Sequence, residues 1–214
     1  MEMRVFHYAM IAVLLAAMTP VVAPASAETL GDARVGFSAE RVLVIDGQSY
    51  VGKMWHMPGE QRHDEDLSAV KPIFILRTDS AIGDIILPQL HTVVEFVLPK
   101  ELSILGNPGL LRKPVGQEPV NGIATTKYAV DEETPRGHAV GLLWLSADGI
   151  PMRCDARFFA TDKDKVSTIR WELRHVKIGQ QDAALFEIPR GYAKLPPEAA
   201  APLLGMRLAR PPAR

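Results

Sequence analysis

Residues 138–178 decide the fold class, and they read HAVGLLWLSADGIPMRCDARFFATDKDKVSTIRWELRHVKI. Apolar and polar side chains alternate in three runs, 138–146, 150–160 and 166–178, which short polar turns separate. In the last run Ile169, Trp171 and Leu173 occupy one phase, and charged side chains occupy the other. A period of two is typical of strands with one buried face, and short turns join antiparallel neighbours. The segment therefore predicts three consecutive antiparallel strands.

The same alternation continues toward the N-terminus. It recurs at 37–46, where Asp46-Gly47 is a turn signal, and a second run follows at 49–57. Further β-rich runs lie at 70–79, 82–87 and 91–98. We therefore expect about eight to ten strands, in an order that short connections fix, and a mainly β (α+β) fold class.

Helical segments are expected to be few and short. Residues 99–106 begin with proline and end with glycine, which favours one or two helical turns. Short helical turns are also expected at 28–35 and 180–185. A sheet with one apolar face must cover that face, and with so few helices we expect it to curl around a core or cavity.

The N-terminus has the three parts of a secretory signal. A short start carries Arg4, an uninterrupted apolar run spans 8–18, and Ala25-Ser26-Ala27 places small residues at a cleavage site. The apolar run is shorter than the roughly 20 residues that a membrane-spanning helix needs. The sequence predicts a signal peptide at 1–27, its cleavage, and a periplasmic protein without a transmembrane anchor. We expect one domain at 28–193 and a flexible Pro/Ala-rich tail at 194–214.

Charge and cysteine content narrow the possible partners. The net charge is −1, so neither nucleic acid nor an anionic membrane surface is favoured as a partner. Cys154 is the only cysteine and lies in the apolar phase of 150–160. We expect it to be a small buried side chain instead of a reactive thiol.

Motifs that would name a reaction are missing from the sequence. It contains no G-x-S-x-G elbow, no phosphate-binding loop and no H-E-x-x-H. A hairpin would bring His56 and His63 together with Asp64, but their spacing matches no dedicated metal motif. The acidic run 64–66 is expected to be a solvated turn. We therefore predict a protein that is not an enzyme, with no catalytic residue, no cofactor and no metal.

Several stretches resemble the exported LolA-like proteins, the outer-membrane lipoprotein-sorting superfamily. They are GKMWHMPGEQR at 52–62, IFILRTD at 73–79, GQEPVNG at 116–122, LWLS with GIPMR at 143–153, and FEIPRGY at 186–192. Together they cover about residues 36–192. The resemblance implies a strongly curved, half-open, barrel-like antiparallel sheet with short helical segments over an apolar concave face, which receives lipid or acyl chains.

Large apolar side chains of the matching strands are the candidate ligand-binding residues. They are Phe37, Leu43, Trp55, Ile75, Trp144, Phe158, Trp171 and Leu173. Small barrels enclose single ligands, but these side chains also suit an ordinary core. Two hypotheses follow for an exported protein: a carrier of lipid, acyl chains or lipoprotein-like cargo, or a periplasmic protein-binding or sensing module without lipid.

Overall fold

The structure, a computed structural model, describes residues 28–29, 31–66, 71–98, 111–134, 137–161 and 166–199. The expected signal peptide, the expected helix at 99–106 and residues 200–214 of the expected tail lie outside the described residues.

The described residues form one mainly β sheet, which confirms the predicted fold class. Its strands are β1 (Glu28–Thr29), β2 (Phe37–Ile45), β3 (Gln48–Met57), β4 (Glu60–Glu65), β5 (Ile73–Arg77), β6 (Ile82–Leu87), β7 (Thr92–Val97), β8 (Leu111–Gln117), β9 (Thr125–Thr134), β10 (Gly137–Ser146), β11 (Pro151–Ala160), β12 (Val166–Ile178) and β13 (Ala193–Lys194). Two 3-10 turns, η1 (Pro88–Leu90) and η3 (Ala183–Phe186), accompany them, and η3 overlaps the turn expected at 180–185.

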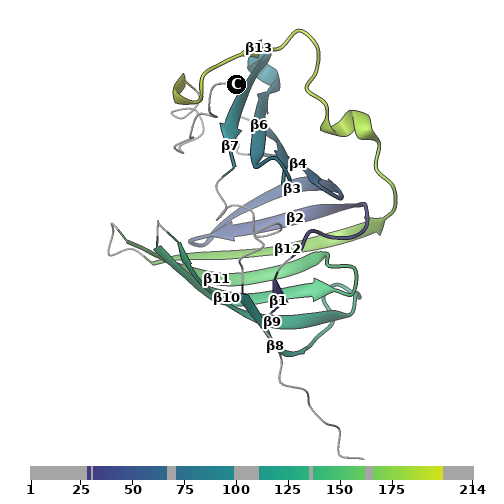
Figure 1. Cartoon of the computed structure of the whole chain (residues 1–214), viewed down its shortest axis with the longest axis vertical. Helices are drawn as coiled ribbons and strands as arrows, with labels where there is room; N and C mark the ends of the chain where they lie inside the picture. The colour runs from purple at the N-terminus through teal and green to yellow at the C-terminus, as the bar shows by residue number, and fades with distance from the viewer. Residues whose placement is uncertain are drawn as a thin grey trace, which may run out of the picture.

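The sheet consists of two meanders that meet side by side. The strand order is β1-β8-β9-β10-β11-β12-β2-β3-β4-β5-β6-β7-β13, so the sheet is open. Its pairs are antiparallel, except for the parallel pair of β13 with β7. Figure 1 shows the purple strands β2 and β3 between green β12 and teal β4. It also shows the strands turning from nearly horizontal at β12 to nearly upright at β7, which gives the strongly curved sheet that we predicted.

Cross-strand register assigns each side chain to one of two faces. Phe37 pairs with His56, and His56 pairs with Gln61, so these three side chains share what we call the Phe37 face. Trp55 pairs with Arg62, and both lie on the opposite face, which we call the Trp55 face.

Buried side chains pack on both faces. The largest cluster contains Phe37, Met152 and Leu173 from the Phe37 face, and a second cluster on that face surrounds Ile85. A third cluster, around Ile75, lies on the Trp55 face. Both faces are therefore covered at the β5–β7 end of the sheet.

A connection that we call the C-terminal strap, residues 179–195, covers the Trp55 face there. It leaves β12 and runs up one side of the sheet to β13 (Figure 1). Its Phe186 is buried in the third cluster. Arg62 Nη1 donates to the Leu185 carbonyl at 2.8 Å, and Arg77 Nη2 donates to the Phe186 carbonyl at 3.4 Å. The first residue of the expected tail, Lys194, belongs to β13. The next residue is also held by the sheet, since Leu195 N donates to the Val93 carbonyl at 2.9 Å.

The helix that we expected at 28–35 is wrong. Glu28 and Thr29 pair with β8, and residues 31–36 are irregular. The amide of Arg34 donates to the Asp148 carbonyl at 2.9 Å, and the Gly36 carbonyl accepts from Gly179 N at 2.9 Å. Distant segments therefore satisfy backbone groups that a helix would have paired internally.

The solvated turn that we expected at 64–66 is also wrong, because 64 and 65 belong to β4. This strand reads EQRHDE, and its burial alternates so that Gln61, His63 and Glu65 face inward. Polar residues occupy both of its phases, so no hydrophobic alternation marks it as a strand. The inward residues are buried because they bond with one another and with β2, as described below.

Candidate functional site: an apolar strip beside a polar row

A partly exposed apolar strip crosses the Phe37 face of four adjacent strands. It consists of Leu43 and Ile45 of β2, Ile169 of β12, Ala156 and Phe158 of β11, and Ala139 of β10. Register places these side chains next to one another, since Ile45 pairs with Ile169 and Ile169 with Ala156. Ile45 is 38% exposed, and the other five side chains are half-buried.

The opposite face of β11 and β12 is strongly charged beside the strip. Between Cys154 and Phe158 of β11 the other phase carries Asp155 and Arg157, and β12 carries Arg170 and Glu172 there. Arg170 Nε lies 3.1 Å from the Asp155 carboxylate in an exposed ion pair. The charged face of β11 and β12 therefore suits water, whereas a partly exposed apolar strip on the other face is typical of a binding surface.

The strip becomes a closed core toward the other end of the strands. Phe37, Leu143, Met152 and Leu173 are at most 1% exposed there. Cys154 is buried beside them, as predicted, and burial raises the pKa of its thiol to about 12. A ligand on this face would thus lie over the strip and not inside the packed cluster.

The eight predicted ligand-binding residues fall on two faces. Five lie on the Phe37 face: Phe37, Leu43, Phe158, Trp171 and Leu173. The other three, Trp55, Ile75 and Trp144, lie on the Trp55 face. Only Leu43 and Phe158 belong to the strip itself, while Trp171 forms part of its buried floor.

The three residues on the Trp55 face have structural surroundings. Trp55 and Ile75 pack with the strap in the third cluster. Trp144 lies between Lys127 and Arg153, at 5.0 and 4.7 Å from its ring centroid. Its Nε1 donates to Glu118 at 3.2 Å, and this bond, with Lys127 nearby, lowers the pKa of the Glu118 carboxyl.

A row of polar side chains borders the strip, and we call it the polar row. It consists of Arg41 of β2 and of Gln61, His63 and Glu65 of β4. Arg41 of β2 and Glu65 of β4 form an ion pair across Gly52 of β3, which lies between them in register. A Cβ at Gly52 would lie 2.8 Å from Glu65 Oε2 and 2.7 Å from the Asp64 carbonyl oxygen. Glycine at this position therefore leaves the space in which the ion pair forms.

His63 continues the polar row from Glu65 along β4. Its Nε2 bonds to Gln61 Oε1 at 3.2 Å, and its side chain is buried. Burial, together with the positive charge of Arg41, lowers the pKa of His63 well below its ordinary value. The ring is therefore neutral near pH 7, and the tautomer with its hydrogen on Nε2 is the one that donates to Gln61 Oε1.

His56, on the same face of β3, holds the N-terminal segment. Its Nδ1 lies 3.0 Å from the Val35 carbonyl, and its Nε2 lies 2.8 Å from Asp32 Oδ1. Asp32 Oδ2 also accepts from Gly59 N at 2.6 Å. These contacts fix residues 31–36 over the end of the packed cluster.

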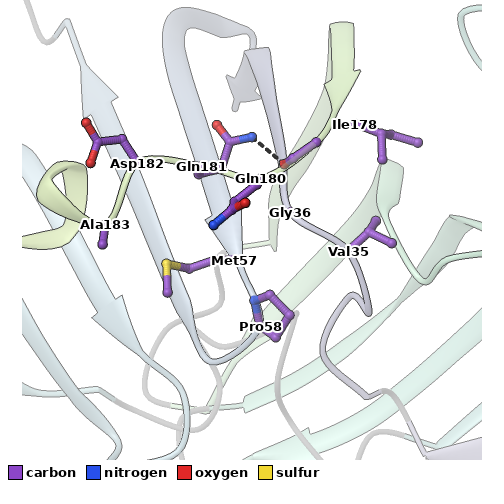
Figure 2. A pocket seen from close by; sticks show the side chains of 10 residues that line it. Val35, Gly36, Met57, Pro58, Ile178, Gln180, Gln181, Asp182 and Ala183 are labelled. Carbon is purple, nitrogen blue, oxygen red and sulfur yellow. Dashed lines mark hydrogen bonds between the residues drawn. The ribbon is translucent and has the colours of Figure 1, made fainter.

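A pocket of about 690 Å³ opens at this end of the sheet. Figure 2 shows Met57, the last residue of β3, and Pro58 of the β3–β4 turn facing Gln180 and Gln181 of the strap across it. Gln181 Nε2 donates to the Gly179 carbonyl at 2.7 Å, which leaves its amide oxygen as an acceptor. The pocket is therefore lined by apolar side chains, Met57 and Pro58, on one side and by the amide groups of Gln180 and Gln181 on the other.

Sequence reasoning did not select Ile45, Ile169, Gln61 or Glu65 as site residues, and it considered His63 only as a possible metal ligand. Ile169 lies in the phase of Trp171, so alternation alone was able to find it. A hairpin that turns at Pro58-Gly59 places Gln61, His63 and Glu65 on the same face as Met54 and His56. That pairing was the signal in the sequence that could have indicated their inward position. Within the described ranges no cluster of metal-ligating side chains occurs, and no helix there is long and apolar enough to cross a membrane.

Comparison with known proteins shows the fold alone. No protein-family model and no curated protein matches this chain. An uncharacterized conserved protein from Thermus thermophilus has the same fold, at 12% identity and a TM-score of 0.51, over 76% of this chain and 90% of that chain. This likeness agrees with the open, curved antiparallel sheet that the LolA-like resemblance implied.

Two further solved structures are more distantly similar. The MucA/MucB complex of Pseudomonas aeruginosa gives 14% identity and a TM-score of 0.45, over 74% of this chain and 59% of that one. A putative outer membrane lipoprotein-sorting protein domain from Vibrio parahaemolyticus gives 9% identity and a TM-score of 0.38, over 71% of this chain and 89% of that one. This chain spans 55–60% of the length of the MucB chains that it matches.

Proposed function

We propose that this protein binds an acyl chain, of a lipid or of a lipid-modified protein, along the apolar strip. The observation that carries the proposal is the contrast between the two faces of β11 and β12. On one face the side chains of Ala156, Phe158 and Ile169 are neighbours and partly exposed. The other face carries the ion pair between Arg170 and Asp155. Each acyl CH₂ group that leaves water contributes about 0.8 kcal/mol, so a chain of ten or so groups binds without a polar anchor.

The expected place of action agrees with this proposal. A signal peptide at 1–27 would export the chain to the periplasm, where acyl chains from the two membranes must cross water in a protected form. The proposed role is to bind or carry such a chain, and it requires no catalytic group. The domain at 28–193 would supply the binding surface.

The experiment compares two adjacent phenylalanines that face opposite ways. Phe158 lies in the strip, whereas Phe159 is 38% exposed on the Trp55 face. We expect Phe158→Glu to abolish the fluorescence of bound N-phenyl-1-naphthylamine and the uptake of a fluorescent fatty acid. Phe159→Glu should leave both unchanged, because it adds the same charge on the side of β11 that faces away from the strip. Equal losses in the two variants, or no uptake by the native protein, would overturn the proposal.

A second candidate function is recognition of an envelope protein at the pocket beside the strap. The amide groups of Gln180 and Gln181 stand next to Met57 and Pro58 there, and such a mixture suits a peptide backbone with an apolar side chain. Gln180→Ala with Gln181→Ala should weaken capture of a peptide partner and leave dye binding intact. Loss of dye binding alone would instead assign the pocket to the lipid site.

A further inference from the structure

Strand β12 has an irregular stretch near its end, at Arg174, His175 and Val176. Its ladder with β2 shifts register between Arg174 and Lys177, as at a β-bulge. His175 has a φ of 52°, in the left-handed region that residues other than glycine seldom adopt. Bulges change the direction in which a side chain points, and they are over-represented next to active sites.

A pocket of about 460 Å³ opens beside this bulge. The three consecutive residues of the bulge line it, together with Asn121, Gly122 and Ile123 of the connection between β8 and β9. In a regular strand the neighbours Arg174 and His175 would point to opposite faces of the sheet. The bulge is therefore what brings both of these side chains to one pocket.

The turn across the pocket is a tight two-residue hairpin. Val120 and Ile123 exchange two backbone hydrogen bonds of 2.9 and 3.0 Å. Asn121 and Gly122 between them have φ values of 48° and 81°, as such turns require. Asn121 Nδ2 donates to the Leu173 carbonyl of β12 at 2.7 Å. The turn is therefore fixed against β12 and forms a firm wall of the pocket.

Arg174 is held by one carboxylate and keeps two of its nitrogens unpaired. Its Nε lies 3.3 Å from Glu172 Oε1, and Asn121 Nδ2 donates to the same oxygen at 3.2 Å. Within the described part of the chain, neither Nη1 and Nη2 of Arg174 nor the ring nitrogens of His175 have a hydrogen-bond partner. Both side chains carry N–H groups, so the pocket offers donors from each of them.

The charges around the pocket are balanced. Glu172 bonds to Arg174, Glu40 of β2 lies opposite Arg174 in the ladder, and Lys177 follows the bulge. Net charge therefore attracts no ligand here, and selection depends on short-range hydrogen bonds. The two terminal nitrogens of a guanidinium match the paired oxygens of a carboxylate or a phosphate group.

We propose that this pocket binds an organic oxyanion, a carboxylate or a phosphate ester of a small molecule. Arg174 would bind the oxyanion with its two terminal nitrogens, and His175 would donate to it. Ile123 and Val176 would contact the apolar part of the ligand. The pocket volume lies in the range of roughly 300–1,000 Å³ that is typical of small-molecule sites. The inference is independent of the proposed function, because the pocket and the strip residue Ile169 lie toward opposite ends of β12.

The test follows the ring signals of His175 by NMR while ligands are added at constant pH and ionic strength. Phenyl phosphate and benzoate should shift these signals in a saturable way, whereas the uncharged benzyl alcohol should not. Inorganic phosphate should bind several-fold more weakly, since it lacks an apolar part. If neither phenyl phosphate nor benzoate shifts the signals, or if benzyl alcohol shifts them equally, the inference fails. If inorganic phosphate binds as tightly as phenyl phosphate, the pocket takes an adventitious ion only.

Variants assign the binding to Arg174 and His175, with the side-chain amide signals of Asn121 as the readout. Arg174→Gln should weaken binding of phenyl phosphate about tenfold, because it removes the charged donors. Arg170→Gln, on the same face of β12, is the matched control and should leave binding unchanged. Equal effects of these two substitutions, or unchanged binding in Arg174→Gln, would refute the assignment.

His175→Gly separates a binding role from a structural one. Glycine adopts a positive φ without strain, so this variant should have a higher urea midpoint than the native protein. It should nevertheless bind phenyl phosphate more weakly, because the imidazole donor is gone. Unchanged binding in His175→Gly would exclude His175 from the site. The titration of the native chain decides whether the pocket binds an oxyanion even where a variant fails to fold, and dye binding to the strip should be unaffected throughout.

Discussion

Replacing Gly52 with alanine should destabilise the protein, although alanine usually stabilises a strand relative to glycine. The new Cβ would lie 2.7 Å from the Asp64 carbonyl oxygen and 2.8 Å from Glu65 Oε2. The carbonyl belongs to the β3–β4 ladder and moves only with its strand, so the backbone there must shift, and the Glu65 side chain must give way as well. Displacing it separates Glu65 from Arg41, and the Glu65 side chain is only 6% exposed.

The magnitude follows from two opposing contributions. Removing one partner of a buried ion pair costs about 3–5 kcal/mol, and the lower end applies here because Arg41 retains some contact with water. Glycine in a strand costs about 0.5–1 kcal/mol relative to alanine, so the substitution regains that amount. The free energy of unfolding should therefore fall by about 2 kcal/mol, which lowers a urea midpoint by about 1 M.

Urea unfolding, followed by tryptophan fluorescence, measures this change. Gly116→Ala is the matched control, because Gly116 also lies in a strand and its Cβ would meet nothing within 4 Å. We expect the control to be as stable as the native protein or slightly more stable. If the urea midpoint of Gly52→Ala is unchanged, the reasoning is refuted. In that case the absence of a Cβ at Gly52 is not what allows Arg41 and Glu65 to form their ion pair.

Three further predictions concern single side chains. The unfolded chain protonates His63 near pH 6.5 but the folded one does not, because burial lowers its pKa. The native protein should thus lose up to about 1.4 kcal/mol of unfolding free energy per pH unit below 6.5, and His63→Gln should reduce that slope in urea titrations at pH 5 to 7. Phe186→Ala should cost about 3 kcal/mol and speed proteolysis of the strap, whereas Leu90→Ala, at a half-exposed site, should cost little; equal stabilities would show that the strap is not anchored there. Cys154, buried and with a pKa of about 12, should react with a thiol reagent at pH 8 only in urea, and rapid labelling of the native protein would contradict its burial.

Prediction from the sequence succeeded where one phase of a strand is apolar and the other is charged. Residues 150–160 and 166–178 have this pattern, so Cys154, Trp171 and Leu173 were placed on the buried face correctly. It was ambiguous in β10, where GLLWL is apolar in both phases. Trp144 there lies on the charged face, between Lys127 and Arg153, and a register shift follows it in the ladder with β11.

The sequence by itself determined the fold class and the local strands, because alternation and turn residues act over a few neighbouring positions. Tertiary structure alone decided that β12 pairs with β2, which joins the two meanders. The burial of the polar residues of β4 was also decided by the tertiary structure alone. Glu65 forms its ion pair with Arg41 only when β2, β3 and β4 are paired side by side. A polar side chain becomes favourable inside a protein when distant residues supply its partners, and the pattern of a single strand does not contain that information.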